Sequence, residues 1–264
     1  MEQPLLAEQK RQRLFLLLCG IFLTNALIAE IIGMKIFSVE ALLGLPPAQL
    51  PIGGEKLDFN MTAGVLNWPV VFITSDIINE YFGKKGVKRI SYLTAGFIVY
   101  TFITIYFSTQ LPPAKFWLDV NNTDSHGNPF NINDAFFRIF NQGLGIMIGS
   151  IVAFLLGQIL DVSVFSWLRR RTGGKYIWLR ATGSTMFSQL VDSFVVLTIA
   201  FYVFGNWDMK QIFSVGSINY LYKGSVAILL TPVLYVAHYF IDRYLGKEYA
   251  EQLAHHAAHD GEVL

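Results

Sequence analysis

The chain has 264 residues, of which 53% are hydrophobic and only 15% are charged, and its formal net charge is +1. Soluble domains carry about 25% charged residues, so this composition is typical of a membrane protein. A net charge near zero gives no electrostatic support for binding a nucleic acid. The single cysteine, Cys19, excludes an internal disulfide and a cysteine-based metal cluster.

Six apolar blocks are long enough to cross a bilayer as helices, which takes about 20 residues each. They are Leu14–Phe37, Asp58–Phe82, Ile90–Ser108, Asn141–Leu168, Ile177–Gly205 and Ile212–Tyr244. Pro69 and Pro232 interrupt the second and sixth blocks, because proline removes a helical hydrogen bond. We therefore predict an all-α integral membrane bundle of six transmembrane helices over residues 14–244.

Lysine and arginine gather before the first block, after the second, after the fourth and after the sixth. Such residues remain on the cytoplasmic side, so both termini are predicted to be cytoplasmic. The bundle would then lie in the cytoplasmic membrane between a short cytoplasmic segment, 1–13, and a polar cytoplasmic tail, 245–264. We interpret the tail, with His255, His256 and His259, as a solvated segment rather than a metal site.

The longest connection, from Thr109 to Asn141, is rich in Asn, Asp, Pro and Gly, which is typical of an external loop with turns. Near its end, Phe136, Phe137 and Phe140 follow a helical spacing. This spacing predicts a short helix that lies on the outer membrane surface.

The phrase Gln-x-x-Asp occurs twice inside apolar blocks, as Gln158–Asp161 and as Gln189–Asp192. Residues three apart share one face of a helix. A carboxylate in the hydrocarbon layer costs roughly 2.5–3.5 kcal/mol on insertion scales unless it faces a polar cavity or a partner. Two such phrases therefore indicate a polar cavity inside the bundle.

Other polar and aromatic residues lie at a similar depth in their blocks, and we expect them to line this cavity as substrate-binding residues. The candidates are Asn25, Asn67, Trp68, Phe72, Gln158, Gln189, Asp192 and Lys223. Intramembrane charges usually pair, so Lys223 is expected to contact Asp192. The alternative for this pair is a purely structural salt bridge.

A second group of polar residues is expected to support or gate the cavity, and part of it lies nearer the cytoplasm. It comprises Asp76, Asn79, Glu80, Asp161, Arg180, Ser184 and Ser188. Ion-pair networks also occur away from functional sites, so a structural clamp with Arg180 or Lys88 is the alternative. A stripe of small residues, Gly145, Gly149, Ala153 and Gly157, predicts that another helix approaches closely.

The sequence lacks the motifs of several classes of enzyme. The sequence has no glycine-rich phosphate loop ending in Gly-Lys-Ser/Thr, so the chain is not expected to hydrolyse ATP. It also has no His-Glu-x-x-His or Gly-x-Ser-x-Gly motif and no pair of cysteines. We expect neither a catalytic role nor a bound cofactor or metal.

Three sequence segments resemble the signatures of the queuosine precursor transporter family, within the vitamin uptake transporters. The run from Ser75 to Gly83, Ser-Asp-Ile-Ile-Asn-Glu-Tyr-Phe-Gly, resembles the second-span signature. Residues 178–185 and 188–193 resemble the fifth, and Lys223 with Thr231-Pro232 and Tyr235 resembles the sixth. The likeness covers residues 14–244 but neither the outer loop nor the histidine tail.

The resemblance implies uptake of 7-deazaguanine precursors of the tRNA base queuosine, such as 7-cyano-7-deazaguanine. The candidate residues suit a guanine-like ligand on chemical grounds, because a carboxylate accepts two adjacent N–H donors as a bidentate pair. Gln and Asn side chains pair with carbonyl and N–H groups, and Trp68 or Phe72 can stack on a planar base. Other flat polar heterocycles would suit the same residues.

Two further functions remain open from the sequence. The chain could be the substrate-binding subunit of an energy-coupled vitamin transporter, with separate ATPase and coupling subunits docking near the small residues Ala29 and Gly33. It could instead be an intramembrane enzyme or a scaffold. Co-purification with an ATPase would favour the first, whereas binding of a deazaguanine without chemical change would exclude an enzyme.

Overall fold

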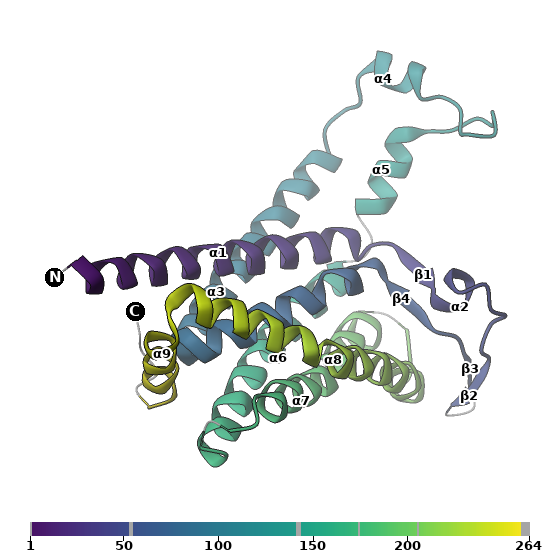
Figure 1. The fold of residues 1–264 in the computed structure, drawn as a ribbon. Coiled ribbons are helices and arrows are strands. Elements are labelled where there is room, and N and C mark those ends of the chain that lie inside the picture. The colour runs from purple at the N-terminus through teal and green to yellow at the C-terminus, as the bar shows by residue number, and fades with distance from the viewer. Residues whose placement is uncertain (1, 53–54, 141–143, 174, 205, 260–264) are drawn as a thin grey trace.

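The computed structural model describes the chain except for residues 1, 53–54, 141–143, 174, 205 and 260–264. Within this part, five helices are long and apolar enough to cross a membrane. They are α1 (Glu2–Ile32), α3 (Trp68–Thr109), α6 (Leu144–Arg171), α7 (Ile177–Leu197) with its π-helical continuation η2 (Thr198–Val203), and α8 (Met209–Leu245). The predicted all-α membrane bundle is confirmed (Figure 1). The predicted bounds Asn141 and Gly205 lie outside the described residues.

Helix α3 contains the third predicted block and the larger part of the second. Its 42 residues would span about 60 Å if straight, roughly twice the ~30 Å hydrocarbon core of a bilayer. The helix is broken at Gly83, whose φ of 74° and ψ of 177° are not helical. Glycine adopts a positive φ without steric cost, so this residue permits the break. The two parts of α3 diverge there (Figure 1).

The predicted ends facing the first connection are wrong. Helix α1 ends at Ile32 rather than continuing to Phe37, and α3 begins at Trp68 rather than at Asp58. Pro69 lies in the first turn of α3. Backbone N–H groups in a first turn have no acceptor within the helix, so proline costs no hydrogen bond there. The apolar residues in between form short strands, so their hydrophobicity did not indicate a longer helix.

The connection between α1 and α3 is folded into two small antiparallel ladders. Its elements are β1 (Ile36–Ser38), α2 (Val39–Leu42), β2 (Leu50–Ile52), β3 (Glu55–Leu57), β4 (Asn60–Thr62) and the 3-10 turn η1 (Ala63–Leu66). Strand β1 pairs with β4, and β2 pairs with β3. The Glu40 carboxylate accepts a hydrogen bond from the Phe59 N–H (2.7 Å) and one from the Ser38 hydroxyl (2.9 Å). These bonds, the first above all, lower the pKa of Glu40 below its ordinary value.

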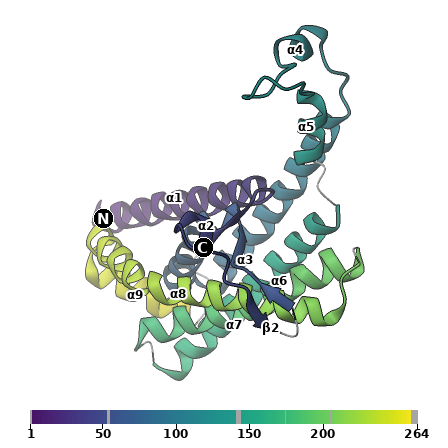
Figure 2. The same ribbon diagram turned by 90° about the vertical axis from the view of Figure 1, so that its right-hand side faces the viewer.

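The long connection after α3 contains α4 (Lys115–Val120) and α5 (Ile132–Phe140). The short helix expected around Phe136, Phe137 and Phe140 is confirmed as α5. Both views show this connection projecting away from the remaining helices (Figures 1 and 2). Its place on the outer membrane surface stays a prediction.

The C-terminal residues are not the solvated tail that the sequence suggested. They form α9 (Lys247–His259), which packs against α3 and buries Ala250, Leu253 and Ala257. The tail looked polar because only one face of this helix is apolar. The side chain of His259 and residues 260–264 lie outside the described part.

Both chain termini lie at one end of the bundle (Figure 1). The Tyr249 hydroxyl donates to the Glu8 carboxylate (3.4 Å), and the Lys10 ammonium donates to the Tyr244 carbonyl (3.1 Å). These contacts join the start of α1 to α9 and to the end of α8. We call this the terminal end of the bundle.

Helices α6, α7 and α8 pack closely where small residues meet. A Cβ atom added to Gly149 of α6 would lie 3.0 Å from the Val196 carbonyl oxygen of α7, and one added to Gly216 of α8 would lie 2.7 Å from the Phe194 ring. Packing rather than hydrophobicity joins helices in lipid, so such close approach contributes to stability. The expected close approach is confirmed at Gly149, whereas the surroundings of Gly145 are not described. Pro232 lies inside α8.

Candidate functional site

A cavity lies between α3, α6, α7 and α8, and we call it the central cavity. It holds about 330 Å³ of empty space, counted to its open mouth. Its lining is Trp68, Phe72, Phe154, Gly157, Gln158, Ser188, Gln189, Asp192 and Lys223. Six of the eight residues expected to bind substrate are therefore brought together here. Phe154 was not among them, because a Phe in an apolar helix carries no distinguishing signal.

An ion pair forms one wall of the central cavity. The Lys223 ammonium of α8 donates to the Asp192 carboxylate of α7, as the sequence predicted. The two side chains remain 23% and 20% exposed, respectively, so this pair is not sealed inside the protein. A ligand in the cavity can reach the Asp192 carboxylate beside the Lys223 ammonium.

The two predicted glutamines differ in their surroundings. The carbonyl oxygen of Gln158 accepts a hydrogen bond from the Ser75 hydroxyl at 3.0 Å. The carbonyl oxygen of Gln189 is buried and has no hydrogen-bond partner in the structure. Leaving a buried acceptor unsatisfied costs about 1–3 kcal/mol, so this atom is suited to accept a donor from a ligand.

Aromatic rings cover another wall of the central cavity. The Trp68 and Phe72 rings are stacked, with centroids 5.9 Å apart and an interplanar angle of 19°. Phe154 of α6 contacts Trp68 at a centroid distance of 5.8 Å. A planar ligand can stack on such faces, as nucleobases do on aromatic side chains.

Asn25 and Asn67, the other two candidates, do not line this cavity. The Asn67 amide donates to the Asn25 carbonyl at 2.9 Å, and the Asn25 amide donates to the Ile21 carbonyl at the same distance. These bonds tie α1 to the start of α3. Both residues lie at positions in their apolar blocks similar to those of the cavity residues. Their side chains nevertheless lie outside the cavity lining.

A buried ion cluster lies near the terminal end. Arg180 donates to both carboxylate oxygens of Glu80, at 2.8 and 3.2 Å, and Arg169 donates to one of them at 3.1 Å. Arg169 also donates to the Ala254 carbonyl of α9. The pair of Glu80 with Arg180 is the one that the alternative of a structural clamp requires. Arg169 was missed, because it begins a run of three arginines that was interpreted as loop charge.

The remaining supporting residues connect this cluster to the central cavity. The Ser188 hydroxyl lies 3.3 Å from the Asp161 carboxylate, to which it donates. The Asn79 amide donates to the Val162 carbonyl at 3.5 Å, and Ser184 donates to its own helix at Ala181. Asp161 is thus one step removed from the cavity, behind Ser188.

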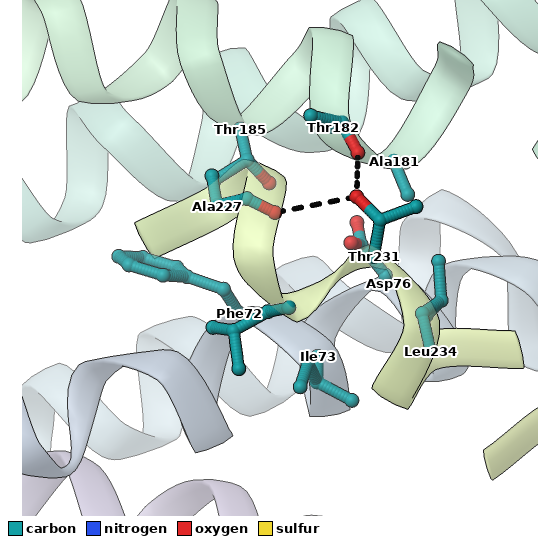
Figure 3. Close-up of a pocket in the computed structure, with 10 residues that line it drawn as sticks. Phe72, Ile73, Asp76, Ala181, Thr182, Thr185, Ala227, Thr231 and Leu234 are labelled. Atoms are coloured by element: carbon teal, nitrogen blue, oxygen red, sulfur yellow. Dashed lines mark hydrogen bonds between the residues drawn. The ribbon is translucent and has the colours of Figure 1, made fainter. Parts of the chain in front are cut away.

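A second cavity, which we call the inner cavity, adjoins the central one and is shown in Figure 3. It holds about 310 Å³ of empty space and is lined by Phe72, Ile73, Asp76, Ala181, Thr182, Thr185, Ala227, Leu230, Thr231 and Leu234. The hydroxyl oxygens of Thr182 and Thr231 lie 2.7 Å apart across it. Oδ1 of Asp76 is buried without a hydrogen-bond partner. Neither threonine was a candidate, since threonine is common in apolar helices.

Residues 62–237 match the model of a family described as "Putative vitamin uptake transporter". A "Probable queuosine precursor transporter" of Bacillus subtilis (strain 168) is 29% identical over 188 residues, which cover 69% of this chain and 74% of the relative. The protein of the same name from Haemophilus influenzae is 31% identical, covering 67% of each chain. The "Queuosine precursor transporter" of Escherichia coli (strain K12) is 26% identical, covering 71% and 76%. No solved structure matches significantly.

Proposed function

We propose, because the chain belongs to the queuosine precursor transporter family of vitamin uptake transporters, that it imports 7-deazaguanines such as 7-cyano-7-deazaguanine. It is a multi-pass bacterial membrane protein. In this proposal the ligand passes into the cytoplasm unchanged, so the chain acts as a transporter and not as an enzyme. Queuosine modification of tRNA would then use the imported base.

The observation that carries this proposal is the wall formed by Asp192, Lys223 and Gln189 opposite stacked aromatic rings. The Asp192 carboxylate accepts the two adjacent N–H donors of a guanine-like edge as a bidentate pair. The unpartnered Gln189 carbonyl accepts a further N–H. Trp68 and Phe72 stack on the ring system. The ion pair with Lys223 holds the Asp192 side chain at the cavity wall.

In the proposed topology, the two parts of α3 cross the membrane separately, which gives six crossings and places both termini in the cytoplasm. The break at Gly83 supports this arrangement, because it lies beside Lys84, Lys85 and Lys88. The arginines 169–171 end α6 close to Glu80 and so also lie at the terminal end. Basic residues therefore gather where the termini lie, as expected of a cytoplasmic face.

The chain is proposed to work without docked ATPase subunits. The small pair Ala29 and Gly33, considered as a docking surface, packs within the chain instead. Ala29 is only 2% exposed, and a Cβ atom added to Gly64 of η1 would lie 2.6 Å from its carbonyl oxygen. Ala29 is therefore already covered by an element of the same protein.

Uptake of labelled 7-cyano-7-deazaguanine into bacteria that cannot make deazaguanines tests the proposal. Cells with the wild-type chain should accumulate the label, and Asp192→Asn should lower uptake at low substrate concentration by about 30-fold or more. Truncating one partner of a buried charged hydrogen bond costs about 2–5 kcal/mol, which sets this expectation. Asp134→Asn, at an exposed carboxylate of α5, is the matched control. Normal uptake by Asp192→Asn would refute the role of this carboxylate.

A stability series on purified variants separates ligand binding from simple charge pairing. Lys223→Met should lower the melting temperature more than the double variant Lys223→Met/Asp192→Asn, because one buried charge left alone is worse than none. If Lys223 instead contacts the carbonyl or nitrile of the ligand, both variants should fold and neither should transport. Full stability and normal uptake in Lys223→Met would contradict the assigned role of the pair.

A further inference from the structure

The central and inner cavities share one wall and lie in series along the bundle. Phe72 lines both, so its ring stands between them. On α3, Asp76 of the inner cavity is one turn closer to the terminal end than Phe72 is. On α7 and α8, Thr182 and Thr231 are likewise closer to that end than Gln189 and Lys223 are. All three helices thus place the inner cavity between the central cavity and the terminal end.

The inner cavity contains its own unsatisfied carboxylate. Asp76 is 5% exposed, and its Oδ1 has no hydrogen-bond partner in the structure. A buried carboxyl oxygen without a partner is costly, because the hydrogen bonds that it would make to water are not replaced. Asp76 of α3, Thr182 of α7 and Thr231 of α8 line the same cavity, and Figure 3 shows the hydrogen bond between the two threonines.

The polar groups of the inner cavity repeat the chemistry of the central one. Each cavity contains one aspartate and neutral polar side chains, and Phe72 lines both, whereas Lys223 lines only the central cavity. In the inner cavity, the Thr182 and Thr231 hydroxyls share one hydrogen bond, and Thr231 also donates to the Ala227 carbonyl at 3.4 Å. A hydroxyl can rotate, so either threonine can give up its present bond and donate to a ligand carbonyl instead. Asp76 is left to accept N–H donors.

We propose that the inner cavity is a second binding site for the same class of ligand, a planar heterocycle with adjacent N–H donors, on its way to the cytoplasm. The inference rests on the proposed function. The Asp76 carboxylate accepts the ligand donors after they leave Asp192, and the Phe72 side chain moves aside to let the ring pass. Asp76 therefore determines the rate of passage and not the affinity of the central cavity.

The first test separates binding from passage with Asp76→Asn, and Asp134→Asn serves again as the exposed-carboxylate control. The maximal uptake rate of Asp76→Asn should fall at least about tenfold, as expected for a lost charged hydrogen bond. Its dissociation constant for 7-cyano-7-deazaguanine, measured by equilibrium binding to purified protein, should stay within about twofold of wild type. An unchanged uptake rate would overturn the proposal.

The second test detects the ligand in the inner cavity directly. Cys19 is the single native cysteine, so a Cys19→Ser/Ala227→Cys chain carries one thiol, at the inner-cavity wall. Saturating 7-cyano-7-deazaguanine should slow its alkylation from the cytoplasmic face, and Asp76→Asn should remove this protection. Alkylation at the same rate with and without ligand would overturn the proposal.

Failure of this inference is distinguishable from failure of the proposed function. If wild-type cells accumulate no deazaguanine, the function is wrong. If they do, and Asp76→Asn transports at the full rate, only the inner site is wrong. Should Asp76→Asn fail to accumulate in the membrane, Thr182→Val/Thr231→Val removes both hydroxyls at little change in volume. That variant should show the same loss of rate, and normal transport by it would refute the site.

Discussion

At the scale of single residues, the two cavities are marked by acceptors that the protein itself leaves unsatisfied. Nearly all buried polar atoms in proteins have a hydrogen-bond partner, so each exception requires an explanation. The carbonyl oxygen of Gln189 and Oδ1 of Asp76 are two such exceptions, and each lines a cavity. Both are acceptors, so together they indicate a ligand that is rich in N–H donors.

Replacing Gln189 tests whether its carbonyl is kept for a ligand. Gln189→Leu removes an unsatisfied acceptor at similar volume, so the melting temperature of the purified protein should stay equal or rise. Affinity for 7-cyano-7-deazaguanine, measured by equilibrium binding, should fall by about tenfold, the effect of roughly one to two kcal/mol. A stability loss with unchanged affinity would mean that the amide serves the fold.

Residue pairs were predictable from the sequence where both partners stood out against an apolar background. Lys223 and Asp192 are such a pair, since each lies in the middle of a hydrophobic block. The burial of Arg169 was not predictable, because nothing in the sequence distinguishes it from the next two arginines, which are exposed. Only the packing of α9 over the end of α6 shows that its guanidinium is buried.

At the scale of elements, the contact between α6 and η2 depends on a missing side chain. The backbone of Ala200 lies 3.3 Å from where a Gly149 Cβ would stand, and the Val196 carbonyl is closer still. Backbone atoms cannot rotate away as a side chain can. Gly149 therefore sets how closely α6 approaches α7 and η2. This distance also positions the wall of α7 that carries Asp192.

Gly149→Ala should destabilise the purified protein by about 1–3 kcal/mol, the usual cost of overpacking. Gly96→Ala is the matched control, because a Cβ at Gly96 of α3 meets nothing within 4 Å. That control should be neutral or stabilising, since alanine is favoured over glycine inside helices by up to about 1 kcal/mol. Thermal unfolding in detergent compares the two, and equal melting temperatures would contradict the packing argument.

The existence of the long helices was predictable, but several of their ends were not. Hydrophobicity at a helical length predicts a span, and that signal is strong for α1, α6, α7 and α8. Residues such as Ile36, Phe37 and Met61 are equally apolar, yet they form the β1–β4 ladder. Their hydrophobicity alone does not distinguish a strand from the end of a helix.

At the scale of the whole molecule, the two ends of the bundle differ in character. The terminal end combines α9, the Glu80 ion cluster and the basic residues that follow Gly83. The opposite end carries the β ladders and the projecting connection with α4 and α5 (Figures 1 and 2). This asymmetry motivates a topology with the terminal end in the cytoplasm.

Cysteines placed at opposite ends test that topology. In a Cys19→Ser chain, Thr123→Cys should react with an impermeant thiol reagent added to intact cells, and Thr172→Cys should react only after the membrane is opened. Thr123 lies in the connection between α4 and α5, and Thr172 follows the basic end of α6. Labelling of both sites from the same side would refute the six-crossing arrangement.

Pro232 divides α8 into two helical segments that can bend relative to each other. Proline has no N–H, so the carbonyl of residue 228 receives no bond from it, and the helix bends most easily at this point. Lys223 lies on the first segment and forms the ion pair with α7. His238 and Leu245 lie on the second segment, which reaches the terminal end. The second segment can therefore tilt to widen the passage beside Thr231 while the first keeps the ion pair between Lys223 and Asp192.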